Sequence, residues 1–432
     1  MSQEPTAFVL FRIGFSRLLD GVGVVLLTWL CCQVLFGGSQ VFETEALWVG
    51  GLGALACWLS PGARRRLPIP LLAYVGIAVF SAAVHRWPVV SAEPAPNWWT
   101  IFAPAGSLMT MAVYVLGVAH LLRDRLRVSL FVVLLASSIC VLAAQIMFDR
   151  TVTGFLYNEA GSTHLPSVAQ WAGLHQTGLL LVIGLPLILS VAMLRRTAPE
   201  VAASLTLSLM LIVVAFFNGS RGAIAVMVLT AIGMLLAKVF WQSMAGWFRP
   251  VVVAVITALP LLLWYLTTNV TTSARAWSLP SGRVQIWEAA ASVVRDHPWL
   301  GVGPGNYTTA MFTGGYAERF LYQVEGRYSG AEQAHNLLLH VAAETGVFGA
   351  MFLLALFLWL ARGCWSAFRA GEVPLVSVAL LFALLAFLLR SMTDNFLDGL
   401  VSIDRTRVLV WSLFAAALAV SRLPMHAARW RA

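Results

Sequence analysis

Apolar runs of membrane-spanning length recur along the chain and limit its fold more than any other feature. They lie at residues 18–36, 45–60, 69–85, 101–121, 128–148, 174–194, 201–217, 222–240, 250–268, 335–361, 375–391 and 406–421. A helix needs about 20 apolar residues to cross the hydrocarbon core of a bilayer. Because lipid offers the backbone no hydrogen-bonding partner, such segments must be helical. The sequence therefore predicts an all-α polytopic membrane protein with about 12 transmembrane helices.

The composition excludes a soluble globular chain. Of the 432 residues, 59% are hydrophobic and only 11% are charged, whereas soluble domains are about half apolar and a quarter charged. We therefore predict a single transmembrane domain over residues 1–432. The net charge of +9 does not predict nucleic-acid binding, because most basic residues lie in short gaps between apolar runs. The polar start lacks a small-residue cleavage site, which predicts that no signal peptide is removed.

Basic residues fill every second gap between the apolar runs. They are Arg12, Arg17, Arg64, Arg65, Arg66, Arg123, Arg125, Arg127, Arg195, Arg196, Lys238, Arg249, Arg362, Arg369, Arg422, Arg429 and Arg431. Cytoplasmic loops carry an excess of arginine and lysine, so this alternation predicts that both termini are cytoplasmic. On the opposite, outer side the longest gap is 269–334, where we expect short helices packed on the membrane surface.

Two outer motifs place an arginine where a helix is expected to begin. Asn218, Ser220 and Arg221 belong to the sequence Asn-Gly-Ser-Arg-Gly, which joins two runs, and Ser281 is a plausible N-cap just before Arg283. A helix N-terminus with an arginine is suited to binding an anion. The alternatives are a snorkelling arginine at the first motif and an ordinary solvated loop arginine at the second.

A third outer motif begins where the long gap returns to the membrane. His335 and Asn336 are followed after nine residues by Gly346 and Gly349. On a continuous helix His335 and Gly346 share a face, and the two glycines would let another helix approach closely. A histidine at the outer end of a span beside a basic loop is a candidate functional group, and a structural role is the alternative.

The other polar residues predict structural roles. His340 and Glu344 lie four residues apart and are expected to pair within the membrane. Glu43, Glu45, Asp394 and Asp398 are outer carboxylates that could bind a metal, and a solvated or ion-paired role is the alternative. They form no clear ligand set, and the chain has no Walker loop, GxSxG or HExxH motif. We therefore predict neither a metal nor a cofactor.

Taken together, the three motifs resemble those of the O-antigen ligase and polymerase superfamily of bacterial envelope glycosyltransferases. The ligase pattern of His, then Asn, Ser or Gln, nine residues, and Gly-x-x-Gly is matched by His335 to Gly349. The outer arginine of the family is matched by Arg221, and its loop pattern by Gly282 to Trp287 followed by Pro298 to Gly303. The resemblance covers about residues 205–360.

This resemblance implies a GT-C-like fold in the bacterial inner membrane, with a periplasmic 269–334 loop and active site. It implies a donor glycan on undecaprenyl pyrophosphate, a lipid A–core acceptor and surrounding membrane lipids as partners. His335 would be the general base, and Arg221 and Arg283 would bind pyrophosphate. The substrate-binding residues would be Ser220, Asn218, Asn336, Gln333 and Arg275.

Three other functions remain open. An O-antigen polymerase and a protein O-oligosaccharyltransferase belong to the same class of enzyme. The latter often carries additional C-terminal sequence, whereas this chain stops soon after the last run. A transporter of lipid-linked sugars is more remote, because it would predict paired repeats and charges in the middle of spans.

Overall fold

The computed structural model describes residues 15–27, 42–59, 68–85, 98–152, 174–195, 197–217, 221–241, 283–321, 323–324, 327–328, 331–392 and 405–423. Nearly all of these residues are helical. The labelled helices are α2 (Phe42–Leu59), α3 (Ile69–Val84), α4 (Trp98–Leu121), α5 (Arg125–Val152), α6 (Leu174–Leu194), α7 (Ala198–Phe217), α8 (Arg221–Trp241), α10 (Arg283–Asp296), α11 (Tyr307–Thr313), α12 (Tyr316–Phe320), α13 (Leu337–Arg369), α14 (Pro374–Ser391) and α15 (Arg405–Arg422). Strands β1 (Gln323–Val324) and β2 (Arg327–Tyr328) form one short antiparallel pair.

The helices follow the apolar runs of the sequence. Each of α2 to α8 and α13 to α15 coincides with a predicted run, and a helix over 15–27 overlaps the first one. The run at 250–268 lies outside the described residues. Within the described part of the chain, 5 helices are long and apolar enough to cross a membrane. The helical membrane-type architecture is therefore confirmed, whereas the number of about 12 spans stays a prediction.

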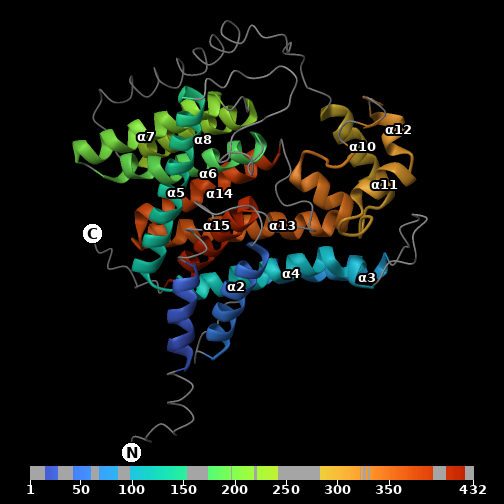
Figure 1. Cartoon of the computed structure of the whole chain (residues 1–432), viewed down its shortest axis with the longest axis horizontal. Helices are drawn as coiled ribbons and strands as arrows, with labels where there is room; N and C mark the ends of the chain where they lie inside the picture. Colours follow the sequence, from blue (N-terminus) through green and yellow to red (C-terminus); the bar gives the residue numbers. More distant parts are fainter. Residues whose placement is uncertain are drawn as a thin grey trace, which may run out of the picture.

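The helices pack around a common apolar core in which α6 is central (Figure 1). In the span Thr177–Leu194 of α6, 89% of the residues are buried, compared with 28% in the span Ala198–Phe216 of α7. Helix α6 contacts α14, α7 and α8, and α13 contacts α14, α3 and α15. The exposed side chains of α7 are largely leucine and other apolar residues, as expected of a surface that faces lipid.

Ion pairs join segments from several of the basic gaps at one end of the bundle. The buried Asp20 carboxylate lies 2.5 Å from Arg123 and 3.2 Å from His120. Arg125, at the start of α5, pairs at 2.6 Å with Glu372, which lies in the turn between α13 and α14. Gaps that were predicted to share one side of the membrane therefore lie together. That this side is cytoplasmic stays a prediction.

The described part of the long 269–334 gap folds into short helices, as the sequence predicted. Helices α10, α11 and α12 form a group beside the N-terminal half of α13 (Figure 1). They share a second apolar cluster that includes Ile286, Val293, Tyr307 and Met311 and reaches Ala343 of α13. This packing fixes the loop helices against the helix that follows His335.

Candidate functional site

Helix α13 is broken at Gly346, eleven residues after His335. Gly346 has φ 75° and ψ 178°, a backbone region that is essentially restricted to glycine. A Cβ atom at this position would lie 1.9 Å from the carbonyl oxygen of Trp299. The next residue, Val347, donates its N–H to the Pro298 carbonyl at 2.8 Å. The break therefore lets the turn at 298–300 pack directly against the backbone of α13.

A glycine loop, residues 301–305, binds the carbonyls that the break exposes. Val302 donates to the Ala343 carbonyl at 2.9 Å, and Gly303 donates to the Glu344 carbonyl at 2.8 Å. Gly301 has φ 65°, and a Cβ atom there would meet the Glu344 backbone at 2.3 Å. Buried carbonyl groups without a helical partner need such donors. The glycine loop thus replaces the hydrogen bonds that α13 loses.

Helix α3 supports the same turn from the other side. The Ser81 hydroxyl donates to the Leu300 carbonyl at 2.6 Å, and it also lies 3.4 Å from the Glu344 carbonyl. Ser81 itself is fully buried. Its hydroxyl therefore links three segments: α3, the turn at 298–300 and the break in α13.

Behind the glycine loop lies a buried polar group formed by Glu344, His340 and Tyr307. A Glu344 oxygen accepts the N–H of Gly305 at 2.9 Å and lies 3.5 Å from Nε2 of His340. The predicted pairing of His340 with Glu344 is thereby confirmed. The Tyr307 ring packs on the imidazole with 4.6 Å between the centroids. Burial, together with the Glu344 carboxylate, raises the pKa of the Tyr307 hydroxyl above its ordinary range.

His335 precedes α13 and has the left-handed φ of 47°, which is uncommon for a residue other than glycine. The residues on either side of it are fixed. Asn336 is the N-cap, because its side-chain oxygen accepts the N–H of Leu339 at 3.1 Å, and its amide donates to the Met392 carbonyl at 3.3 Å. The N–H of Ala334 donates to Nδ1 of His340 at 3.5 Å. The half-buried His335 thus lies between two anchored residues.

Two details of the sequence-based interpretation of this motif are wrong. Since α13 begins at Leu337, His335 does not share a helical face with Gly346. The segment that approaches Gly346 is the turn at 298–300 and not another helix. A Cβ atom at Gly349 would meet the side chain of Thr345, in its own helix.

The two predicted arginines each begin a helix. Arg221 is the first residue of α8, but its side chain is not among the described parts of the chain. The residues Asn218, Ser220, Arg275 and Ser281 also lie outside the described residues. Arg283 is the first residue of α10 and is half-buried. Gln333 is also half-buried and lies two residues before His335. A meeting of the Arg221, Arg283 and His335 side chains stays a prediction.

Sequence reasoning missed several residues that complete this region. Tyr307, Gly305 and Ser81 received no role from the sequence, although the Gly-rich turn at 301–305 marks the place. In α10 the side-chain oxygen of Gln285 and the indole N–H of Trp287 are buried without a hydrogen-bond partner among the described residues. Unpaired buried polar atoms are uncommon and often mark functional surfaces. Among the described residues, no three His, Cys, Asp or Glu side chains gather as possible metal ligands.

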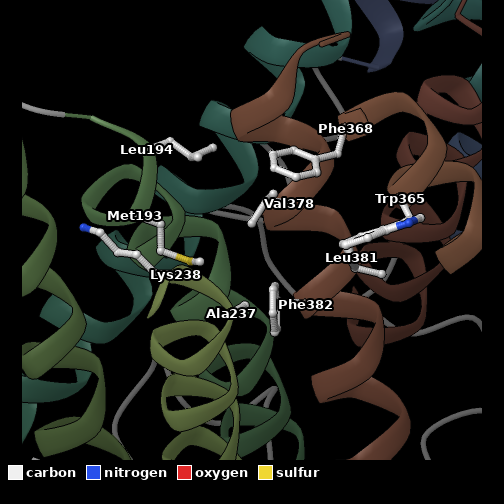
Figure 2. A pocket seen from close by; sticks show the side chains of 9 residues that line it. All are labelled: Met193, Leu194, Ala237, Lys238, Trp365, Phe368, Val378, Leu381 and Phe382. Carbon is white, nitrogen blue, oxygen red and sulfur yellow. The ribbon is translucent and has the colours of Figure 1, made fainter. Parts of the chain in front are cut away.

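A separate apolar pocket lies at the other end of α13. It is lined by Met193, Leu194, Ala237, Lys238, Trp365, Phe368, Val378, Leu381 and Phe382 (Figure 2). The Lys238 ammonium points away from the aromatic side chains, and its nitrogen donates to the Ala192 carbonyl at 2.9 Å. Because Trp365 and Phe368 end the helix that His335 precedes, this pocket is distinct from the candidate site.

The order of the segments described above agrees with a known family. Residues 205–354 match the O-antigen ligase family model. The match contains Arg221, Arg283 and His335 and extends past the break at Gly346. The resemblance predicted from the sequence is thereby confirmed, and the family contains glycosyltransferase-like ligases and polymerases. No curated protein matches the chain.

Proposed function

We propose that this protein is an O-antigen ligase, which transfers a glycan from undecaprenyl pyrophosphate to lipid A–core oligosaccharide. The observation that carries the proposal is the family match over 205–354. All three proposed catalytic residues lie within it, and its last part contains His335 and the broken helix that follows. The proposal includes a GT-C-like arrangement of about 12 spans in the bacterial inner membrane.

His335 is the proposed general base. A neutral imidazole takes the proton from the acceptor hydroxyl while the hydroxyl oxygen attacks the anomeric carbon of the donor. The bond from this carbon to the pyrophosphate oxygen breaks, and undecaprenyl pyrophosphate leaves. Attack from the side opposite the leaving group inverts the anomeric configuration. The anchored residues on both sides of His335 support this role, because a base must be held in one orientation.

Arg221 and Arg283 are the proposed ligands of the pyrophosphate. Each is the first residue of a helix, where free backbone N–H groups also favour an anion. A guanidinium group binds phosphate oxygens in pairs and stabilises the negative charge that develops on the leaving group. This mechanism requires no metal. Asn218, Ser220, Arg275 and Gln333 are proposed to contact the substrates, and Asn336 to act through the cap that it forms.

The proposed site lies on the periplasmic face, with both termini in the cytoplasm. Both substrates are anchored in the same membrane by lipid chains. A site where the loop helices meet the outer end of α13 is reachable by both of them without either leaving the bilayer. The arginine alternation of the sequence supports this orientation.

Complementation of two bacterial strains tests the proposal. The gene for this chain is expressed in one strain that lacks its O-antigen ligase and in another that lacks its O-antigen polymerase. Lipopolysaccharide gels should show a restored ladder on lipid A–core in the first strain only. Restored chain length in the second strain would indicate a polymerase. Transfer of glycan to protein Ser or Thr residues in the first strain would indicate a protein O-oligosaccharyltransferase.

A further inference from the structure

The left-handed backbone at His335 requires contacts that hold it from both sides. On its C-terminal side, the cap formed by Asn336 and the contact of Asn336 with Met392 supply them. On its N-terminal side, the described contact is between the N–H of Ala334 and Nδ1 of His340, at 3.5 Å. A second, buried histidine therefore holds the peptide group between Gln333 and Ala334, one residue before the proposed catalytic histidine.

This contact determines where the His340 ring carries its proton. Because Nδ1 faces an N–H donor, Nδ1 must present its lone pair, and in a neutral imidazole the proton is then on Nε2. Nε2 faces the Glu344 carboxylate at 3.5 Å, which favours a proton on that nitrogen. The ring of Tyr307 covers the imidazole, and both His340 and Glu344 are buried. The geometry thus selects one tautomer and one ring orientation.

Glu344 is in turn fixed by the glycine loop. Its side-chain oxygen accepts the Gly305 N–H at 2.9 Å, and its backbone carbonyl accepts the Gly303 N–H at 2.8 Å. A continuous series of contacts therefore runs from Gly305 through Glu344 and His340 to Ala334. It connects the break in α13 with the residue next to His335.

We infer that His340 and Glu344 are a positioning pair for His335: they hold the Ala334 peptide group so that the neighbouring imidazole points at the acceptor hydroxyl. This inference rests on the proposed function. The pair makes no contact with substrate and donates no proton in the reaction. Its effect is on the rate of the chemical step, because a base displaced by about 1 Å can lower a rate by about 100-fold.

Two amide variants of His340 form a matched test. The side-chain oxygen of His340→Asn lies close to where Nδ1 was, so it keeps an acceptor for the Ala334 N–H. The longer side chain of His340→Gln places its polar group near the former Nε2 and loses that acceptor. We expect kcat of His340→Gln to be lower by about tenfold or more. We expect kcat of His340→Asn to fall by less, because Asn loses the contact with Glu344 but keeps the acceptor for Ala334, with KM for the donor unchanged in both.

The assay uses purified full-length protein, an undecaprenyl-pyrophosphate-linked glycan and rough lipopolysaccharide as acceptor. Equal kcat values for the two variants, or a higher value for His340→Gln, would overturn the inference. So would a loss that appears only as a raised KM, because that would indicate a contribution to donor binding. Thermal unfolding of both variants in the same detergent checks that they are folded to the same extent.

A double-mutant cycle separates positioning from a general structural role. If His340 acts only through His335, His340→Gln should cause no further loss in a His335→Ala background. The same fold loss in both backgrounds would show that His340 acts independently of His335. Failure of the proposed function is distinguishable, since the unchanged protein would then transfer no glycan. An active protein with a fully active His340→Gln variant would remove the inference alone.

Discussion

Replacement of Gly346 by alanine tests the broken helix directly. The residue has φ 75° and ψ 178°, and a non-glycine residue in this region costs about 1–3 kcal/mol. The added Cβ atom would lie 1.9 Å from the Trp299 oxygen and 2.6 Å from the Leu300 nitrogen, and forced repacking of this kind costs about 1–3 kcal/mol. Separation of Val347 from the Pro298 carbonyl removes about 1 kcal/mol more. We expect destabilisation of about 3–7 kcal/mol in total.

Thermal unfolding in detergent, followed by tryptophan fluorescence, measures this effect. For a chain of this length the loss corresponds to a melting temperature about 3–8 °C lower. Gly76→Ala in α3 is the matched control, because a Cβ atom at Gly76 meets nothing within 4 Å. The control should melt within about 1 °C of the unchanged protein, since alanine is the better helix former. Equal melting temperatures for the two variants would refute the close approach of the 298–300 turn.

The remaining predictions concern glycan transfer. His335→Ala should insert normally and lower kcat by about 10²- to 10⁴-fold, the usual contribution of a general base, and near-normal transfer would exclude that role. Arg221→Lys and Arg283→Lys should each lower kcat about tenfold or more, because an ammonium replaces a two-pronged donor. Two fully active lysine variants would show that charge alone suffices. Transfer by purified protein should persist in EDTA, and a loss that Mg²⁺ or Mn²⁺ restores would contradict the metal-independent mechanism.

The positions of the helices were predictable from the sequence, but their places in the bundle were not. Lipid and a protein core select the same apolar side chains, so the buried α6 and the exposed α7 are both strongly apolar. Hydropathy therefore predicts that both are spans without indicating which of them is central. The charged residues at the helix ends are more informative about the arrangement of the helices. Arg125 pairs with Glu372, which is the lone acidic residue of the turn after α13.

The candidate site was predictable only where neighbouring residues determine it. The i, i+4 spacing of His340 and Glu344 predicts their contact because helix geometry alone brings them together. The break at Gly346 was not predictable, because a glycine in an apolar helix is equally compatible with close helix packing. The contacts that decide it come from the turn at 298–300, far earlier in the chain. Gly305 was likewise visible as a turn residue, but its carboxylate partner was not.

The hydrogen bond from Ser81 to Leu300 also indicates when the site can form during synthesis of the chain. The two residues are 219 positions apart, and a ribosome adds about 5–20 residues per second, so α3 is made about 10–45 s before its partner carbonyl exists. Meanwhile the Ser81 hydroxyl can bond to a carbonyl of its own helix, as serine in a helix commonly does. Helix α3 is therefore synthesised before the turn that it helps to hold in place. The site can therefore form only after the turn at 298–300 has been synthesised and has reached α3.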